Sequence, residues 1–164
     1  MLQIENETDL RHWLRDNIGP KISIQWIEPS KYGSSIGQPD CTISYGTTKI
    51  SLELKVWDLT RNGIRCKMRP VQRRWHHVNN RNGTLTAVLA YVKDQYIILV
   101  RGDHVPLRDY ASDPNSGCKG GHLIYRIIYY DYDDDYLSYY NKKLNLKNCL
   151  FNNEHNFWDN YGEL

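Results

Sequence analysis

The chain has 164 residues and a mass of 19.4 kDa, a size that suits one domain with room for a small appended subdomain. A hydrophobic fraction of 40%, a mean hydropathy of −0.67 and no apolar run near the roughly 20 residues of a membrane span indicate a soluble protein without membrane contact. The net charge is +2, and the four cysteines lack the Cys-x-x-Cys pairing of many zinc sites, so we expect reduced thiols.

The N-terminus has neither the basic flank nor the apolar core of a signal peptide, so we expect a cytoplasmic location. Helical periodicity then predicts a helix over residues 7–17, capped by Asn6, with one buried apolar stripe. A strand follows, indicated by apolar residues that alternate with polar ones: Ile22, Ile24 and Trp26. Residues 29–37 are rich in Ser and Gly and are predicted to form a loop.

A β-hairpin is predicted next. Residues 40–45 form its first strand and residues 49–57 its returning strand, with turn residues between them. Because side chains alternate between the two faces of a strand, Glu53 and Lys55 share a face. Asp40, which opens the first strand, can then lie beside both of them.

Two carboxylates and an ammonium at one sheet edge suit metal-assisted hydrolysis of a phosphodiester. Asp40 and Glu53 can bind a hard cation, Mg²⁺ or Mn²⁺, through oxygen, and the backbone carbonyl of Leu54 can supply a third ligand. Lys55 can orient the attacking water or stabilise charge that builds on the phosphate. Exposed on a sheet, the same residues would be an ordinary cross-strand ion pair that contributes little.

The rest of the chain completes an α/β pattern. Residues 58–68 are predicted as an irregular loop, and Pro70 opens a second helix that ends before Gly83. Strands follow over residues 84–92 and 95–100. The resulting order is αβββαβ.

Between Leu59 and Val92 the chain has no acidic residue, although it has seven basic ones. Such a block suits a polyanionic partner, although a solvated helix face would have a similar composition. The residues that we expect to contact DNA phosphates are Arg61, Arg65, Lys67, Arg69, Arg73 and Arg74.

The C-terminal part gives weaker signals. After a predicted loop over residues 102–121, a β-prone segment at 123–130 can extend the sheet. A short helix is indicated near residues 136–144, and the aromatic residues near Trp158 suggest that the tail packs on the core or at a dimer interface. We therefore divide the chain into a domain over residues 1–130 and a C-terminal extension over residues 131–164.

The run from Pro39-Asp40 to Glu53-Leu54-Lys55 resembles the PD-(D/E)xK nuclease superfamily. Gly37 and the apolar residues that lead into Glu53 also fit. A Gln on the next helix, Gln72, is similar to that of the VRR-NUC and Holliday-junction-resolvase-like groups. The resemblance covers about residues 22–101. It implies a restriction-endonuclease-like core with a mixed central sheet, which agrees with the order read from periodicity.

The resemblance also implies roles for individual residues. Asp40, Glu53 and Lys55 would be catalytic, and Gln72 could reach the water, the lysine or a phosphate. In several groups of the superfamily an acidic residue from the first helix completes the metal site. The candidates are Glu7, Asp9, Asp16 and, after the first strand, Glu28. We favour Glu7, because helical spacing places it beside the buried stripe.

We therefore expect a Mg²⁺- or Mn²⁺-dependent endonuclease that acts on DNA, resolvase-like in its choice of structure, and dimeric because two strands must be cut symmetrically. The small size and Tyr- and Asn-rich composition resemble those of phage-encoded nucleases, which would place the protein in the host-cell cytoplasm. Two alternatives stay open. One is a non-catalytic nucleic-acid-binding protein that retains the fold, and the other is an inhibitor of a host enzyme that binds through the acidic residues 131–135.

Overall fold

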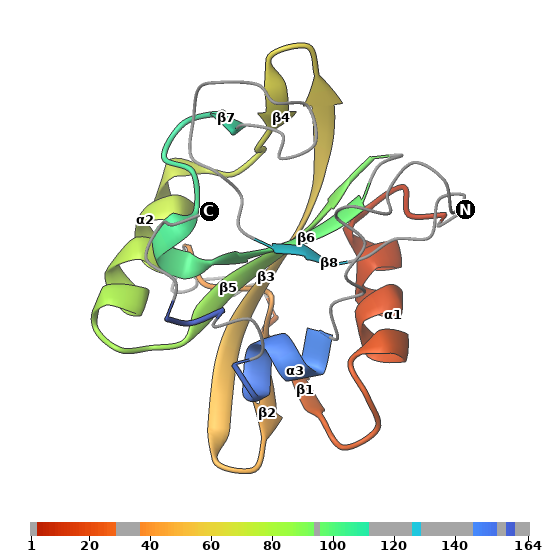
Figure 1. The fold of residues 1–164 in the computed structure, drawn as a ribbon, viewed down its shortest axis with the longest axis vertical. Coiled ribbons are helices and arrows are strands. Elements are labelled where there is room, and N and C mark those ends of the chain that lie inside the picture. The colour runs from red at the N-terminus through yellow and green to blue at the C-terminus, as the bar shows by residue number, and fades with distance from the viewer. Residues whose placement is uncertain are drawn as a thin grey trace.

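The structure, a computed structural model, describes residues 3–28, 37–93, 96–111, 126–128, 146–153 and 157–159. In chain order its elements are α1 (Glu7–Asn17), β1 (Ser23–Trp26), β2 (Cys41–Tyr45), β3 (Thr48–Thr60), β4 (Gly63–Arg65), α2 (Pro70–Arg81), β5 (Thr86–Val92), β6 (Tyr96–Arg101), the 3₁₀ turn η1 (Gly102–His104), β7 (Tyr110–Ala111), β8 (Arg126–Ile128) and α3 (Leu146–Phe151) (Figure 1). No described helix is long and apolar enough to cross a membrane.

The central sheet is mixed. Its strand order is β1-β2-β3-β5-β6-β8, and β3 and β5 pair in parallel, whereas its other neighbouring strands pair antiparallel. Helix α2 provides the crossover between the two parallel strands. The predicted α/β fold with αβββαβ order and a mixed central sheet is confirmed, and β8 confirms that the β-prone segment extends the sheet.

The start of α1 is specified locally. The side chain of Asn6 accepts a hydrogen bond from the backbone of Asp9 (3.1 Å), and the Asp9 carboxylate accepts one from the backbone of Asn6 (3.3 Å). This reciprocal pair is a capping box, which satisfies two of the backbone donors at a helix start. Leu10 and Leu14 then lie fully buried against the sheet, as their spacing predicts.

Two apolar clusters cover the two faces of the sheet. One contains the buried side chains of α1 and α3, and the other gathers alternate residues of β5 with Trp57, Ile64 and Val105. Strand β5 is buried along its whole length because both of its faces are covered, as is usual for the parallel part of a sheet. Helix α2 packs on β5 and on η1 (Figure 1).

The prediction of an irregular loop at residues 58–68 is wrong. Strand β3 continues to Thr60, and the chain turns through two residues into β4, which pairs with β3 and with β7. Gly63 has a φ of +106°, which glycine adopts without a steric penalty, and the Thr60 hydroxyl donates to the Gly63 carbonyl (2.9 Å). Likewise, η1 and β7 lie inside the predicted loop at residues 102–121.

The described part of the tail packs on the sheet. Helix α3 places Leu146, Cys149 and Leu150 in the same cluster as α1, and Phe157 joins it. The indole of Trp158 donates a hydrogen bond to the Leu150 carbonyl (2.8 Å). These residues of the tail therefore lie in the core of the described structure. The helix predicted near residues 136–144 and the acidic run lie outside the described residues, and the domain boundary at residue 130 stays a prediction.

Candidate active site

The register of the hairpin brings the first two carboxylates together. Cys41 pairs with Leu52, so that Asp40, one residue earlier, falls opposite Glu53. One carboxylate oxygen of Asp40, Oδ2, accepts a hydrogen bond from the backbone N–H of Leu54 (2.7 Å). Because the N–H and C=O of one strand residue point to the same side, the Leu54 carbonyl lies on the side of β3 that faces Asp40.

Glu53 lies at the centre of the site and is only 1% exposed. Its Oε1 accepts hydrogen bonds from Lys55 Nζ (2.9 Å) and from Gln72 Nε2 (2.7 Å). Its Oε2 is also buried, but it has no hydrogen-bond partner among the described residues. A buried carboxylate oxygen without a donor is costly, so a ligand with positive charge would be stabilised at this position.

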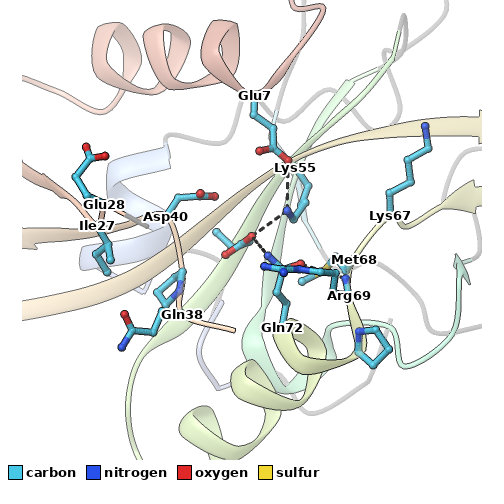
Figure 2. Close-up of a pocket in the computed structure, with 13 residues that line it drawn as sticks. Glu7, Ile27, Glu28, Gln38, Asp40, Lys55, Lys67, Met68, Arg69 and Gln72 are labelled. Atoms are coloured by element: carbon cyan, nitrogen blue, oxygen red, sulfur yellow. Dashed lines mark hydrogen bonds and ion pairs between the residues drawn. The ribbon is translucent and has the colours of Figure 1, made fainter. Parts of the chain in front are cut away.

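The amide of Gln72 is held at both ends. Its Oε1 accepts from the backbone N–H of Arg69 (3.1 Å), which leaves Nε2 directed at Glu53. Figure 2 shows Gln72 and Lys55 converging from α2 and β3. The structure therefore places Gln72 against Glu53, so that it can position that carboxylate.

Gly37 determines how closely the segment before Asp40 approaches α2. It has a φ of +81°, and a Cβ at this position would lie 2.9 Å from the Val71 carbonyl oxygen. Any larger residue would push Pro39 and Asp40 away from the helix that carries Gln72. The glycine that belongs to the sequence motif thus has a steric role.

These residues line an open cavity of about 690 Å³, shown in Figure 2. Its lining comprises Glu7, Ile27, Glu28, Gln38, Pro39, Asp40, Glu53, Lys55, Lys67, Met68, Arg69, Pro70 and Gln72. Of the acids proposed to complete the site, Glu7 lies 3.3 Å from Lys55 Nζ, and Glu28 is on the cavity wall. Asp9 belongs to the capping box, and Asp16 pairs with Arg15 at 3.7 Å.

The protonation of the site follows from its burial. Burial, and then the charge of Asp40, raise the pKa of Glu53 to about 7. Burial alone would lower the pKa of Lys55, but the nearby carboxylates of Glu53, Glu7 and Asp40 outweigh it and raise that pKa. Lys55 is therefore an ammonium at neutral pH.

The oxygen atoms of the site fit a hard divalent cation, and two of the donor groups are carboxylates. Asp40 and Glu53 are carboxylates on the same face, and the unpartnered Oε2 of Glu53 and the Leu54 carbonyl add oxygen donors. No cluster of three or more His, Cys, Asp or Glu side chains placed for a shared metal occurs in the part of the chain that the structure describes. Water and substrate oxygens would therefore complete the coordination.

The predicted DNA-contacting residues divide into two groups. Arg61, Arg65, Lys67, Arg69 and Arg74 are exposed, and Lys67 and Arg69 line the cavity. Arg73 is only 4% exposed, and its guanidinium donates to carbonyls within the protein, so the prediction that it contacts a phosphate is wrong. His76, one turn after Gln72 on α2, is fully buried.

Sequence reasoning missed Arg11. Its Nη2 lies 3.6 Å from Oδ1 of Asp40, and its guanidinium lies over the ring of Trp26, 4.7 Å from the ring centroid. A signal was present in the sequence, because Arg11 follows Glu7 by four residues and helical spacing places the two on one face. The charge of Asp40 is thus partly offset from α1.

Neither a protein-family model nor a curated protein matches the chain. Among solved structures it is similar to Hjc of Archaeoglobus fulgidus, a Holliday junction resolvase from an archaeal hyperthermophile. The identity is 14% and the TM-score 0.42, over 60% of this chain and 75% of that one. A similarity this low carries no functional argument.

Proposed function

We propose that this chain is a metal-dependent endonuclease that hydrolyses phosphodiester bonds in DNA. The observation that carries the proposal is the environment of Glu53. Its unpartnered oxygen is buried in the wall of a cavity that also holds Asp40, Lys55 and Gln72. A buried ion pair that served only stability would have its oxygens satisfied.

Asp40, Glu53 and the Leu54 carbonyl would hold the cation, Mg²⁺ or Mn²⁺. Glu7, which contacts Lys55 Nζ as Glu53 does, would complete the site from α1. When bound, such a cation makes a water more acidic and offsets charge that builds on the phosphate. Glu53 stays in place because Gln72 and Lys55 both donate to its Oε1. These two donors leave the second oxygen available.

Lys55 supplies a permanent positive charge at the reacting phosphate. Its side chain is 12% exposed, so it reaches the cavity while most of it is shielded from water. An ammonium in such a position can hold the attacking water by hydrogen bonding and stabilise negative charge as it develops. Lys67 and Arg69, on the rim, would attract the DNA backbone.

The preference for branched DNA and the homodimer follow from the resemblance of the motif, and the location in a host-cell cytoplasm follows from the resemblance in size and composition. Each stays a prediction. A non-catalytic DNA-binding protein is the competing function. It would use the same basic residues, but it would gain nothing from an unpartnered buried carboxylate oxygen.

The test uses four DNA forms, namely linear duplex, single-stranded, flapped and four-way-junction DNA, with and without Mg²⁺. Asp40→Asn, Glu53→Gln and Lys55→Ala should each lower the cutting rate at least ~10²-fold, because each removes a charge that acts on the transition state. Asp16→Asn, on the exposed end of α1, is the matched carboxylate control and should cut normally.

Binding measured in Ca²⁺ should survive in Lys55→Ala, because Ca²⁺ occupies oxygen sites without the octahedral geometry that Mg²⁺ demands. Metal-dependent cutting that persists in Lys55→Ala would show that the active site lies elsewhere. A wild-type protein that binds all four DNA forms and cuts none would establish the DNA-binding alternative.

A further inference from the structure

A small second sheet adjoins the candidate active site. It consists of the last residues of β3 (58–60), β4 and β7, and it lies at the upper end of β3 in Figure 1. Strand β3 runs without a break from Glu53 into this sheet, so Asp58 lies roughly 17 Å from the site along the strand. We call these three strands the arm sheet.

One face of the arm sheet combines positive charge with an exposed aromatic ring. Arg65 pairs directly with Asp58 on one side and with Tyr110 on the other, and paired residues of antiparallel strands point to the same face. Arg65 is exposed, and Tyr110 keeps 40% of its surface exposed. The single acid of this pairing, Asp58, has two ammonium partners, Lys67 at 2.5 Å and Lys93 at 3.4 Å.

The arm sheet is continuous with the cavity. Lys67 lines the cavity and also pairs with Asp58, so one side chain belongs to both surfaces. Figure 2 shows Lys67 extending from the rim, on the side away from Asp40. A nucleic-acid strand that enters the cavity can therefore follow positive charge onto the arm sheet.

The surface is also held in place before any partner binds. The buried guanidinium of Arg73 donates to the carbonyls of Cys66 (2.7 Å), Met68 (3.2 Å) and Pro106 (3.1 Å), to that of Arg108, and to the carboxylate of Asp109 (3.0 Å). It thus ties the segment after β4 to the loop before β7. Preorganisation of this kind lowers the entropy cost of binding.

We propose that Arg65 and Tyr110 form a binding site for unpaired nucleotides of the substrate strand, with the Tyr110 ring stacking on a base and Arg65 contacting a phosphate. An exposed ring beside cations is the arrangement that binds single strands, since every base has a face to stack on. A fully paired duplex keeps those faces inside its stack. The inference rests on the proposed function and adds to it a selection for branched or single-stranded DNA.

The experiment measures anisotropy of a fluorescein-labelled oligothymidylate and of a labelled duplex, with Ca²⁺ in place of Mg²⁺ so that nothing is cut. Tyr110→Ala should bind the oligothymidylate about tenfold more weakly, in the range of one lost base stack. Its affinity for the duplex should change much less. Tyr110→Phe keeps the ring and should bind like the wild type.

Leu107→Ala is the matched control, because Leu107 lies on the loop just before β7 and is 61% exposed but has no ring to stack. Arg65→Ala should weaken binding of both DNAs and flatten the slope of log affinity against log salt by about 0.7 for the single strand. The proposal is overturned if the wild type does not bind the oligothymidylate, if Tyr110→Ala binds it normally, or if Leu107→Ala loses as much affinity.

These outcomes are separable from failure of the proposed function. If the wild type never cuts but Tyr110→Ala still loses its affinity for the single strand, the arm sheet is a nucleic-acid site on a protein that is not a nuclease. If Asp40 and Glu53 are essential for cutting while Tyr110→Ala binds and cuts normally, the proposed nuclease function is supported and the proposed nucleotide site on the arm sheet is wrong.

Discussion

The guanidinium of Arg11 lies 3.6 Å from Oδ1 of Asp40, while Oδ2 of the same carboxylate accepts the backbone N–H of Leu54. Both oxygens of Asp40 therefore have partners within the protein. The Leu54 N–H belongs to the backbone of the paired strand β3, so it cannot move away from Asp40 without disrupting the sheet. Arg11 is a 38% exposed side chain that rests on Trp26, so it is the partner that a cation would have to displace.

Replacing Arg11 should therefore tighten metal binding. Arg11→Met keeps an apolar stem against Trp26 and removes the competing charge. We expect the affinity for Mn²⁺, measured by calorimetry, to rise about two- to fivefold, which is the range of a partly exposed ion pair. Arg15→Met, one turn further along α1, removes the same charge away from Asp40 and serves as the control. Equal or weaker Mn²⁺ binding in Arg11→Met would show that Arg11 does not compete.

Gln72 should act by holding Glu53. Gln72→Leu removes the donor to Glu53 Oε1 at similar volume. Loss of a partner that orients a metal ligand typically costs 10- to 100-fold in metal affinity or rate, and we expect a loss of about that size. Gln25→Leu, on the exposed face of β1, controls for the loss of an amide. Unchanged Mn²⁺ affinity together with unchanged cutting in Gln72→Leu would show that Gln72 only caps the start of α2.

Arg73 and Arg74 are neighbours with opposite environments, which makes them a matched pair. Arg73→Ala would leave buried carbonyls without donors, and we expect it to lower the free energy of unfolding by about 3 kcal/mol. Arg74 is exposed, so Arg74→Ala should change the free energy of unfolding by less than about 0.5 kcal/mol. Urea denaturation measures both. In DNA binding we expect Arg74→Ala to have the larger effect. It should flatten the slope of log affinity against log salt by about 0.9 for duplex DNA, because it removes one phosphate contact.

His76 should make the fold less stable in acid. Burial, followed by the charges of His77 and Lys55, lowers the pKa of His76 to about 3, and neither ring nitrogen has a hydrogen-bond partner in the described part of the chain. The unfolded chain takes up a proton near the ordinary value of 6.5 and the folded one does not. Stability is therefore complete above that pH and is lost as the pH falls toward 3.

The loss from this histidine should amount to about 2 kcal/mol between pH 7 and pH 5, at about 1.4 kcal/mol per pH unit below the unfolded pKa. His76→Leu removes the titrating group and both unpartnered nitrogens. Glu53, whose pKa is raised to about 7, contributes with the opposite sign over this range, but it does so in both proteins. The difference in the free energy of unfolding between His76→Leu and the wild type, from urea denaturation, should therefore change by about 2 kcal/mol between pH 7 and pH 5. A pH dependence equal to that of the wild type would assign the acid sensitivity to other groups.

Much of the fold could be predicted because the signals are local. Asn6 and Asp9 cap a helix through atoms three residues apart, and alternation along β3 places Glu53 and Lys55 on one face without any knowledge of the rest. The hairpin then brings Asp40 to them, since register follows from the turn and the apolar pattern. For the same reason the main helices and strands and their order along the chain could be predicted.

Burial of individual charges was decided by the tertiary structure. Arg73 and Arg74 are adjacent and chemically identical, yet only Arg73 is buried. The backbone carbonyls that accept its hydrogen bonds belong to residues 66–68 and to the loop at 106–108. These two segments come together only when the chain folds. The bonds between Arg11 and Asp40 and between Gln72 and Glu53 likewise join separate elements. Periodicity describes which side of its own helix or strand a residue occupies, but the partner on that side is set by packing between distant segments.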